Sequence, residues 1–296
     1  MRGCAAAANA VTAASNPRAP GSASFVPSAT DIRVPHRRVG ELETTTAGHV
    51  TAREGGIPPL ARHAPKIAIV VNGTEYRGVI TDWGGVLTTP IMTTVRAWIQ
   101  ADGIDWDSYL TVMRAWISEA YGLGGRNPVH ALERGECSGP EFERILAARL
   151  LRTDGGPVAA EGLLRRMFAA SAPVPAMYDA VRALRGAGLR TALLSNSWGC
   201  DEYPRADFAG LFDAVVISGE VGMRKPEPEI FRHAAAQLGL APRECVFIDD
   251  VEPNVAAAVG CGMAGVHHTG ATDTAAALQD LLGVPLAQSA PEGLPR

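Results

Sequence analysis

The sequence predicts an α/β protein with a doubly wound parallel sheet and a small all-helical domain inserted after the first strand of that sheet. Five short apolar runs, each followed by polar residues or glycine, have the pattern of buried strands in a parallel sheet. Helical patterns separate the later runs, and strands that alternate with helices favour right-handed crossovers. The segment 84–189, between the first two runs, contains only helical patterns, which indicates a separate domain.

The strands and the helices between them follow from the spacing of the apolar residues. The predicted strands are 77–83, 190–195, 214–218, 244–249 and 264–268. Residues 177–184 place apolar side chains on one face of a helix. Residues 230–238 do the same ahead of Gly239, a residue type that is common just beyond the end of a helix.

The inserted segment contains four amphipathic stripes. The stripes consist of Val95, Trp98 and Ile99; Leu110, Met113 and Ile117; Phe142, Ile145, Leu146 and Leu150; and Leu163, Leu164, Met167 and Phe168. Ser138 and Glu141 are spaced as a capping box ahead of the third stripe. We expect these stripes to form the core of a helical bundle over the carboxyl edge of the sheet, where open α/β folds bind ligands.

These patterns divide the chain into parts with different expected roles. Residues 66–91 and 175–285 form the predicted sheet domain, and residues 92–174 form the predicted helical domain. Residues 286–296 are expected to be a flexible tail.

The first 65 residues differ in composition from the rest of the chain. They are rich in Ala, Pro, Thr and Gly, and Phe25 is their only aromatic residue. Such a segment buries too little apolar surface to offset the entropy lost on ordering, so we expect a disordered extension. A signal peptide is the alternative, but Asn9 and Thr12 interrupt its alanine-rich run.

Composition narrows the classes of function. The chain has 296 residues and a formal net charge of -4, which gives no reason to expect nucleic acid or an anionic membrane as a partner. It contains no run of 18 apolar residues, the length that a membrane-spanning helix needs. Its 5 cysteines are scattered, without a C-x-x-C pair, which is typical of a reduced cytoplasmic protein.

Chemically active residue types stand at or near the ends of four predicted strands. Asp82 ends the first strand, Ser195 ends the second, and Asp249 and Asp250 end the fourth. Lys225 follows the third strand, just before a helix start that contains two prolines. Each of these residues alone is common in a turn or on a surface. Their order on successive strand ends predicts one shared site.

Four segments carry a resemblance to a known family. They are G-V-I-T-D-W-G-G-V-L-T (78–88), T-A-L-L-S-N-S (191–197), G-M-R-K-P-E-P-E-I-F (222–231) and C-V-F-I-D-D-V-E-P-N (245–254). In this order they resemble the four motifs of the haloacid dehalogenase superfamily of hydrolases, over residues 77–282. The resemblance is to its phosphatase-like members, such as the N-terminal domain of epoxide hydrolases, in subfamily IA. It implies a Rossmann-like core with a C1-type helical cap.

The family resemblance implies an aspartyl-phosphate mechanism for a small phosphorylated metabolite. Asp82 matches the nucleophile, and Ser195 matches the hydroxyl that binds phosphoryl oxygens. Lys225 matches the cation that offsets the charges of Asp82 and the phosphate, as an attack of carboxylate on phosphate requires. Asn196 and Trp83 are further candidates for contacts to the phosphate and the substrate.

The same resemblance implies a Mg²⁺ site. Asp249 and Asp250 match the acidic pair that holds the ion, and Asp82 and the carbonyl of Gly84 complete the protein ligands. Mg²⁺ prefers hard oxygen ligands, which these groups supply.

The sequence departs from the usual phosphatase pattern at Gly84. Most phosphatases of the family carry a second Asp there, which protonates the leaving oxygen. General acid–base help of this kind contributes about 10²–10⁴-fold in rate. Three outcomes are open: an enzyme for activated phosphates, an enzyme that takes its acid from the cap or water, or a catalytically weak phosphate-binding protein. A 2-haloacid dehalogenase also lacks this Asp but needs no metal, so the pair Asp249 and Asp250 disfavours it.

Overall fold

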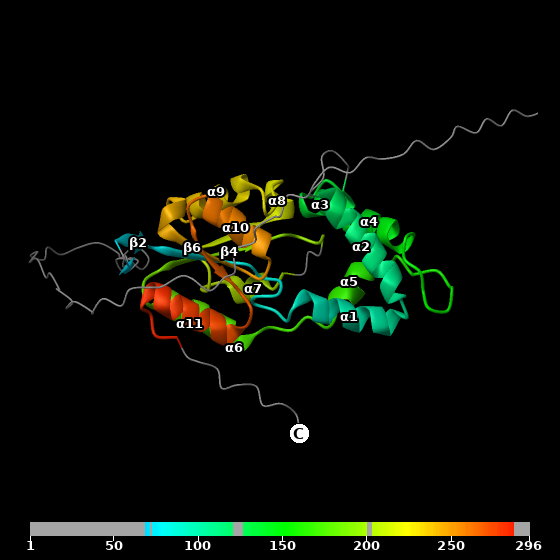
Figure 1. The fold of residues 1–296 in the computed structure, drawn as a ribbon, viewed down its shortest axis with the longest axis horizontal. Coiled ribbons are helices and arrows are strands. Elements are labelled where there is room, and N and C mark those ends of the chain that lie inside the picture. The colour runs from blue at the N-terminus through cyan, green and yellow to red at the C-terminus, as the bar shows by residue number, and fades with distance from the viewer. Residues whose placement is uncertain (1–68, 72, 121–126, 200–202, 287–296) are drawn as a thin grey trace, which may run out of the picture. The chain divides into compact units, whose positions relative to one another are not determined.

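A five-stranded parallel sheet forms the centre of one part of the protein, and the helices within residues 91–168 lie beside that part (Figure 1). The computed structural model describes residues 69–71, 73–120, 127–199 and 203–286, so the predictions for residues 1–65 and 287–296 lie outside it. In the order in which they pair, the strands are β5 (Ala214–Ile217), β4 (Arg190–Ser195), β3 (Gly78–Thr81), β6 (Cys245–Asp249) and β7 (Ala264–His267). The predicted α/β fold is confirmed.

The strand β3 is central, and its register determines which residues meet at the edge of the sheet. Thr81 is paired with Leu193 of β4 on one side and with Ile248 of β6 on the other. Because parallel strands all end at the same edge, the residues that follow β3, β4 and β6 emerge side by side there.

Helices cover both faces of the sheet (Figure 1). One face carries α6 (Pro175–Gly186) and α11 (Ala271–Leu282), and the other carries α9 (Pro228–Gln237) and α10 (Glu252–Gly260). Successive residues of β3 lie on opposite faces of the sheet. Val79 belongs to the hydrophobic cluster that includes α6 and α11, and Ile80 belongs to the cluster that includes α9 and α10. Two short helices, α7 (Arg205–Phe208) and α8 (Ser218–Val221), and the 3₁₀ turn η1 (Pro242–Glu244) complete this part.

A helical insert lies between β3 and β4 and has its own hydrophobic cluster. Its helices are α1 (Ile91–Asp102), α2 (Trp106–Ala120), α3 (Pro128–Glu133), α4 (Gly139–Ala147) and α5 (Leu163–Phe168). The side chain of Ser138 caps α4 by accepting a hydrogen bond from the N–H of Glu141 at 3.3 Å. None of the helices in the described ranges combines the length and apolarity needed to cross a membrane.

The two segments that join the insert to the sheet run antiparallel to each other. The N–H of Thr89 donates to the carbonyl of Ala172 at 2.8 Å, and the N–H of Val174 donates to that of Leu87 at 2.9 Å. This short ladder holds the entry and the exit of the insert together beside the end of β3.

The structure differs from the sequence predictions in three places. A hairpin of β1 (Ile69–Val71) and β2 (Thr74–Tyr76) precedes the sheet and was not predicted, because its strands are only three residues long. The predicted strands 77–83, 214–218, 244–249 and 264–268 are each shorter by one to three residues at their ends. In α2 the buried residues include Tyr109, Met113 and Trp116, while Leu110 is half-buried and the side chain of Ile117 lies outside the described residues. The rings of Tyr109 and Trp116 pack against other aromatic rings of the insert. The buried face of α2 is therefore rotated relative to the predicted face.

We expect Phe231→Ala to lower the free energy of unfolding by about 3–5 kcal/mol, measured by urea denaturation. Phe231 has 0% exposure, and its ring meets that of Phe247 edge-on at 5.1 Å. The matched control is Leu151→Ala, because Leu151 is 63% exposed, and its effect should stay within about 0.5 kcal/mol. Equal effects for the two variants would contradict the assignment of Phe231 to the core.

Candidate active site

A buried lysine joins two carboxylates at the carboxyl edge of the sheet. The Nζ atom of Lys225 lies 2.9 Å from Oδ1 of Asp82 and 2.6 Å from Oδ2 of Asp249. Asp82 follows β3, Asp249 ends β6, and Lys225 lies between α8 and α9. Lys225 is 1% exposed and Asp249 0%, so this ion pair is shielded from water. The fold thus brings together three residues that the sequence analysis selected from distant segments.

Neighbouring donors fix the orientation of both carboxylates. The N–H of Trp83 donates to Oδ1 of Asp82 at 2.7 Å. Asp249 accepts hydrogen bonds from the N–H of Val251 at 2.8 Å and from the side-chain amide of Asn254 at 3.0 Å. Charge-assisted bonds of this kind are stronger than neutral ones, so the two carboxylates are held in defined positions.

Three carboxylates form a cluster that fits a divalent cation. Asp82, Asp249 and Asp250 each offer an oxygen, and these oxygens lie within 4.8 Å of one another. The Oδ1 atom of Asp250 is buried and has no hydrogen-bond partner among the residues that the structure describes. A buried carboxylate oxygen without a donor is costly unless a cation binds it. Hard oxygen ligands in this number suit Mg²⁺, the cofactor expected from the sequence.

The charges in this cluster shift the pKa values of its members. Burial raises the pKa of the Asp82 carboxyl to about 7, against the effect of Lys225 and with support from Asp249. Burial and the charge of Asp249 also raise the pKa of Asp250. Burial disfavours the ammonium form of Lys225, but Asp249 and Asp82 outweigh it and raise the pKa of that lysine. One lysine therefore does not neutralise three carboxylates, and the cluster retains an affinity for positive charge.

The two glycines after Asp82 meet different constraints. Gly85 has a φ of +80°, and a Cβ atom added there would lie 2.2 Å from Oδ2 of Asp250. Gly85 is therefore needed both for its backbone conformation and for the close approach of Asp250. At Gly84 an added Cβ would meet only the end of the Ile91 side chain, at 3.3 Å. A Cβ atom at Gly84 therefore needs only a small shift of the Ile91 side chain.

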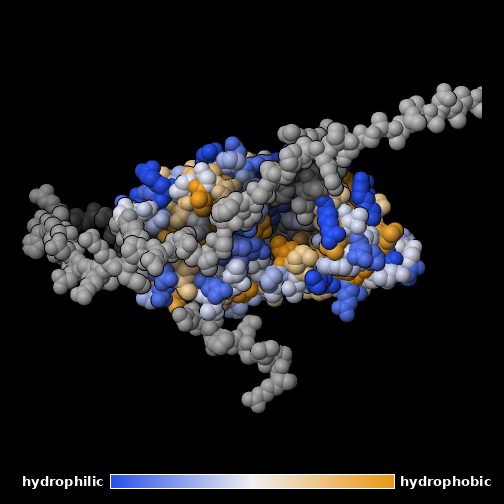
Figure 2. All heavy atoms as spheres, in the orientation of Figure 1, coloured by the Kyte–Doolittle hydropathy of each residue, from blue (hydrophilic) through white to orange (hydrophobic). Residues whose placement is uncertain are grey.

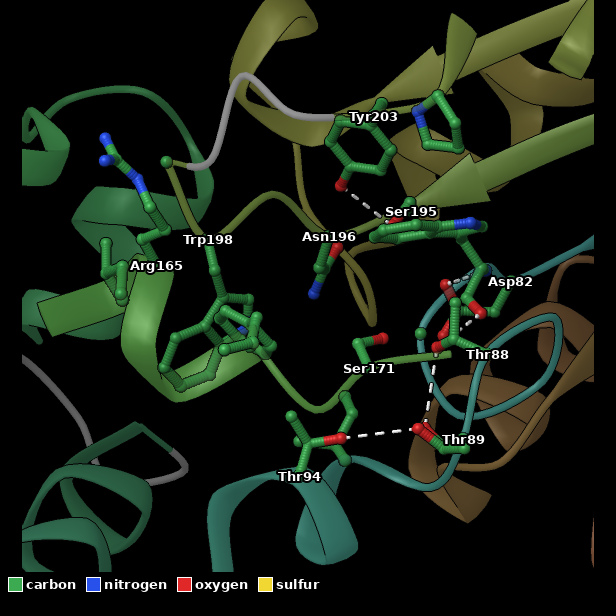
Figure 3. Close-up of a pocket in the computed structure, with 18 of the residues that line it drawn as sticks. Asp82, Thr88, Thr89, Thr94, Arg165, Ser171, Ser195, Asn196, Trp198 and Tyr203 are labelled. Carbon is green, nitrogen blue, oxygen red and sulfur yellow. Dashed lines mark hydrogen bonds between the residues drawn. The ribbon is translucent and has the colours of Figure 1, made fainter. Parts of the chain in front are cut away.

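The polar residues after β4 support the lysine and face the pocket. The hydroxyls of Ser195 and Tyr203 are 3.0 Å apart, as Figure 3 shows beside Asp82. The side chain of Asn196 accepts a hydrogen bond from the N–H of Lys225 at 2.9 Å and donates to the carbonyl of Lys225 at 3.1 Å. Asn196, a sequence candidate for phosphate contact, thus also fixes the backbone of Lys225.

Glu133 of the insert is a site residue that sequence reasoning missed. Its carboxylate is paired with Arg224 and accepts a hydrogen bond from Asn196 at 3.3 Å. Its carbonyl accepts a hydrogen bond from the hydroxyl of Ser218 at 2.6 Å. Glu133 is 5% exposed, so this contact between the insert and the segment before Lys225 is shielded from water. In the sequence, the only signal that Glu133 is buried is its position beside apolar residues of α3.

A pocket of about 1530 Å³ extends from Asp82 to the insert. Its lining includes the sequence candidates Asp82, Trp83, Gly84, Ser195, Asn196, Lys225 and Asp250. It also includes residues of α1, α4 and α5, so the insert forms one wall (Figure 3). Asp249, the remaining candidate, lies behind Lys225 and is fully buried.

The chain is similar in sequence to several known proteins. A mouse protein, acyl-CoA dehydrogenase family member 10, is 30% identical over 247 residues, which are 80% of this chain and 22% of the mouse protein. A sesquiterpene phosphatase of Aspergillus oryzae is 27% identical over 215 residues, which are 71% of this chain and 98% of that protein. This chain therefore spans a minor part of the mouse relative and nearly all of the fungal one.

A solved structure is similar to part of this chain. It is a haloacid dehalogenase family enzyme of Bacteroides thetaiotaomicron, crystallised with magnesium and inorganic phosphate. The TM-score is 0.46 and the sequence identity is 23%, over 65% of this chain and 93% of that chain. A family model of haloacid dehalogenase-like hydrolases matches residues 76–262. Since that match covers more than half of the chain and both sides of the site, the chain belongs to the haloacid dehalogenase-like hydrolases.

Proposed function

We propose that the protein is a Mg²⁺-dependent hydrolase of a phosphomonoester, with Asp82 as the nucleophile. The observation that carries this proposal is the ammonium of Lys225 between Asp82 and Asp249, beside a buried oxygen of Asp250 without a hydrogen-bond partner in the described chain. The name of the fungal relative, a phosphatase aligned over nearly its whole length, supports the same chemistry.

In the proposed mechanism, a carboxylate oxygen of Asp82 forms a bond to phosphorus while the bond from phosphorus to the leaving oxygen breaks. Water then attacks the aspartyl-phosphate and releases phosphate, which restores Asp82. Lys225 offsets the negative charge that gathers on Asp82 and the phosphoryl oxygens, and the hydroxyl of Ser195 binds those oxygens.

The residues that would hold Mg²⁺ are Asp82, Asp249 and Asp250, together with the carbonyl of Gly84. When bound there, the ion would supply charge neutralisation between the attacking carboxylate and the phosphate. The Oδ1 atom of Asp250 is the oxygen that most needs such a partner.

The insert has a proposed role as a C1-type cap, with boundaries at 92–174. It supplies one wall of the pocket, and Glu133 connects it to Arg224, the residue before Lys225. Its size and its contacts suit selection of the substrate, while the sheet edge carries the chemistry.

Gly84 distinguishes this site from that of a general phosphatase. Without a carboxylate at this position, the site favours leaving groups that need little protonation, such as the phenolates of aryl phosphates or the carboxylates of acyl phosphates. Gly84 also motivates the second candidate function, a phosphate-binding protein with little turnover. The cluster of Asp82, Asp249 and Asp250 favours a metal-dependent reaction over dehalogenation.

We expect Asp82→Asn to lower phosphate release from p-nitrophenyl phosphate and acetyl phosphate by about 10³-fold or more, because an amide does not form the acyl phosphate. The matched control is Asp154→Asn, an isosteric change at an exposed carboxylate paired with Arg152, which should retain full activity. Full activity of Asp82→Asn would refute the proposed nucleophile. No phosphate release by the unaltered protein with Mg²⁺ would favour the second candidate function.

The chemical role of Gly84 is testable by adding the missing acid. Gly84→Asp should raise turnover of alkyl phosphates by about 10²–10⁴-fold, because a carboxylic acid there would protonate the leaving alkoxide. Its Cβ would require only a small shift of the Ile91 side chain. The control is Gly84→Asn, which has the same shape without the acid. A gain shared by both variants would show that protonation is not the missing function.

Gly85→Ala should weaken Mg²⁺ binding about tenfold or more, measured by isothermal titration calorimetry, because the added methyl group displaces the Asp250 carboxylate. Gly73→Ala controls for backbone strain. Gly73 has a φ of +79°, and an added Cβ there meets nothing within 4 Å. Equal affinities for Mg²⁺ in the two variants would count against Asp250 as a metal ligand.

A further inference from the structure

The pocket has one chemically reactive end and a larger apolar part. Asp82 and Ser195 lie at one end of the pocket, and Lys225 is paired with Asp82 there. The pocket continues from this end toward Trp198 and Arg165 (Figure 3). Figure 2 shows apolar surface gathered where the sheet domain faces the insert. The apolar side chains of the lining include Trp83, Ile91, Leu164, Phe168, Trp198 and Tyr203.

Aromatic rings from both parts of the protein contribute to this apolar lining. The rings of Trp83 and Tyr203 are 4.8 Å apart, and those of Phe168 and Trp198 are 6.0 Å apart. Trp83 follows β3, Phe168 ends α5, and Trp198 and Tyr203 follow β4. All four side chains are half-buried, so each retains surface toward the pocket.

Several polar groups of the lining are already bonded within the protein. The hydroxyls of Thr89 and Thr94 lie 3.4 Å apart and pair with each other. The carboxylate of Glu143 accepts hydrogen bonds from the N–H groups of Gly162 at 3.1 Å and Leu164 at 2.9 Å. The hydrogen bonds of these groups are thus formed within the protein, and the groups need no partner from a substrate.

Away from the reactive end, most of the charged residues of the lining occupy two kinds of position. Glu133 is buried and paired with Arg224. The exposed ones, whose charged groups are in contact with water, are Arg144, Glu161, Arg165, Arg182 and Asp207. Neither arrangement opposes the entry of an apolar group between the rings.

We propose that the natural substrate is a phosphomonoester with an extended apolar body, which lies between Trp83, Phe168 and Trp198 while its phosphate lies at Asp82. This inference rests on the proposed function, because it places the phosphate at the proposed nucleophile. The volume of about 1530 Å³ exceeds the ~300–1,000 Å³ that is usual for ligand pockets, so the pocket has room for a body larger than a simple sugar or amino acid.

A series of aryl phosphates separates the size of the body from the chemistry of the leaving group. Phenyl, para-methylphenyl, para-butylphenyl and para-octylphenyl phosphate release phenolates of nearly equal basicity. We expect kcat/KM to rise along this series, by up to about fourfold for each methylene group that becomes buried. Phosphotyrosine, which has the same phenyl phosphate core and a charged tail, should be a poorer substrate than para-butylphenyl phosphate.

The outcomes distinguish this inference from the proposed function. If all the esters are hydrolysed but kcat/KM stays flat or falls with chain length, the inference of an apolar body is wrong and the proposed phosphatase function stands. A preference for phosphotyrosine or a sugar phosphate would have the same meaning. Absence of turnover with every ester and with acetyl phosphate would instead refute the proposed function. Competitive inhibition by ethyl-, butyl- and octylphosphonate then measures the preference for body length without any bond cleavage, so a flat series there also overturns the inference.

Substitution of Phe168 tests where the body lies. Phe168→Ala should reduce the gain in kcat/KM from butyl to octyl several-fold, because it removes a ring from the wall that α5 contributes. Leu151→Ala, a change of an exposed apolar residue elsewhere on the insert, should leave that gain unchanged. Thermal unfolding and the octylphosphonate inhibition constant of each variant separate a loss of folding from a loss of contact. An unchanged gain in a folded Phe168→Ala protein would overturn the placement of the body against α5.

Discussion

The ammonium of Lys225 lies between Asp82 and Asp249 with almost no exposure to water, and the elements around it keep it there. Removing one partner from a buried ion pair leaves an uncompensated charge, which is strongly destabilising. The neighbouring positions of β3 and β6 in the sheet bring the two carboxylates together, and the side chain of Asn196 holds the backbone of the lysine from the end of β4. With Asp250 added, the carboxylates outnumber the lysine, and burial raises the pKa of Asp82 to about 7. The same arrangement that fixes the lysine therefore creates a place for a divalent cation.

The helical insert is connected in two ways to the part of the protein that holds Lys225. The two segments that join the insert to the sheet are hydrogen-bonded to each other beside the end of β3, through Thr89 and Ala172. Its Glu133 reaches Arg224 and Asn196, and both of these residues adjoin or bond the backbone of Lys225. A displacement of the insert would thus disturb the segment that carries the lysine. In the proposed enzyme, this connection would link the wall that recognises the body of the substrate to the group that neutralises its phosphate.

The sequence predicted the sheet edge well because short buried strands leave a strong local signal. The apolar runs that end at Asp82, Ser195 and Asp249 are each followed by residues that a central strand would not carry, and parallel strands bring such ends together. Glu133, Tyr203 and the aromatic lining of the pocket could not be predicted in this way. Their roles depend on how α3, α5 and the segment after β4 pack in space, and helical spacing alone does not determine which residue of a buried face meets the site. The rotated face of α2 has the same cause.

The two adjacent glycines show where this chain departs from a common phosphatase and why. Gly85 is fixed by its left-handed backbone and by the contact with Asp250, so the fold itself requires it. Gly84 is less constrained, because an added Cβ atom there would meet only the flexible end of the Ile91 side chain, at 3.3 Å. The absence of a carboxylate at Gly84 therefore does not follow from packing, and we attribute it to the chemistry of the substrate. A phosphate ester with a stable leaving group needs no acid at that position, and a wide apolar pocket would supply binding energy in its place.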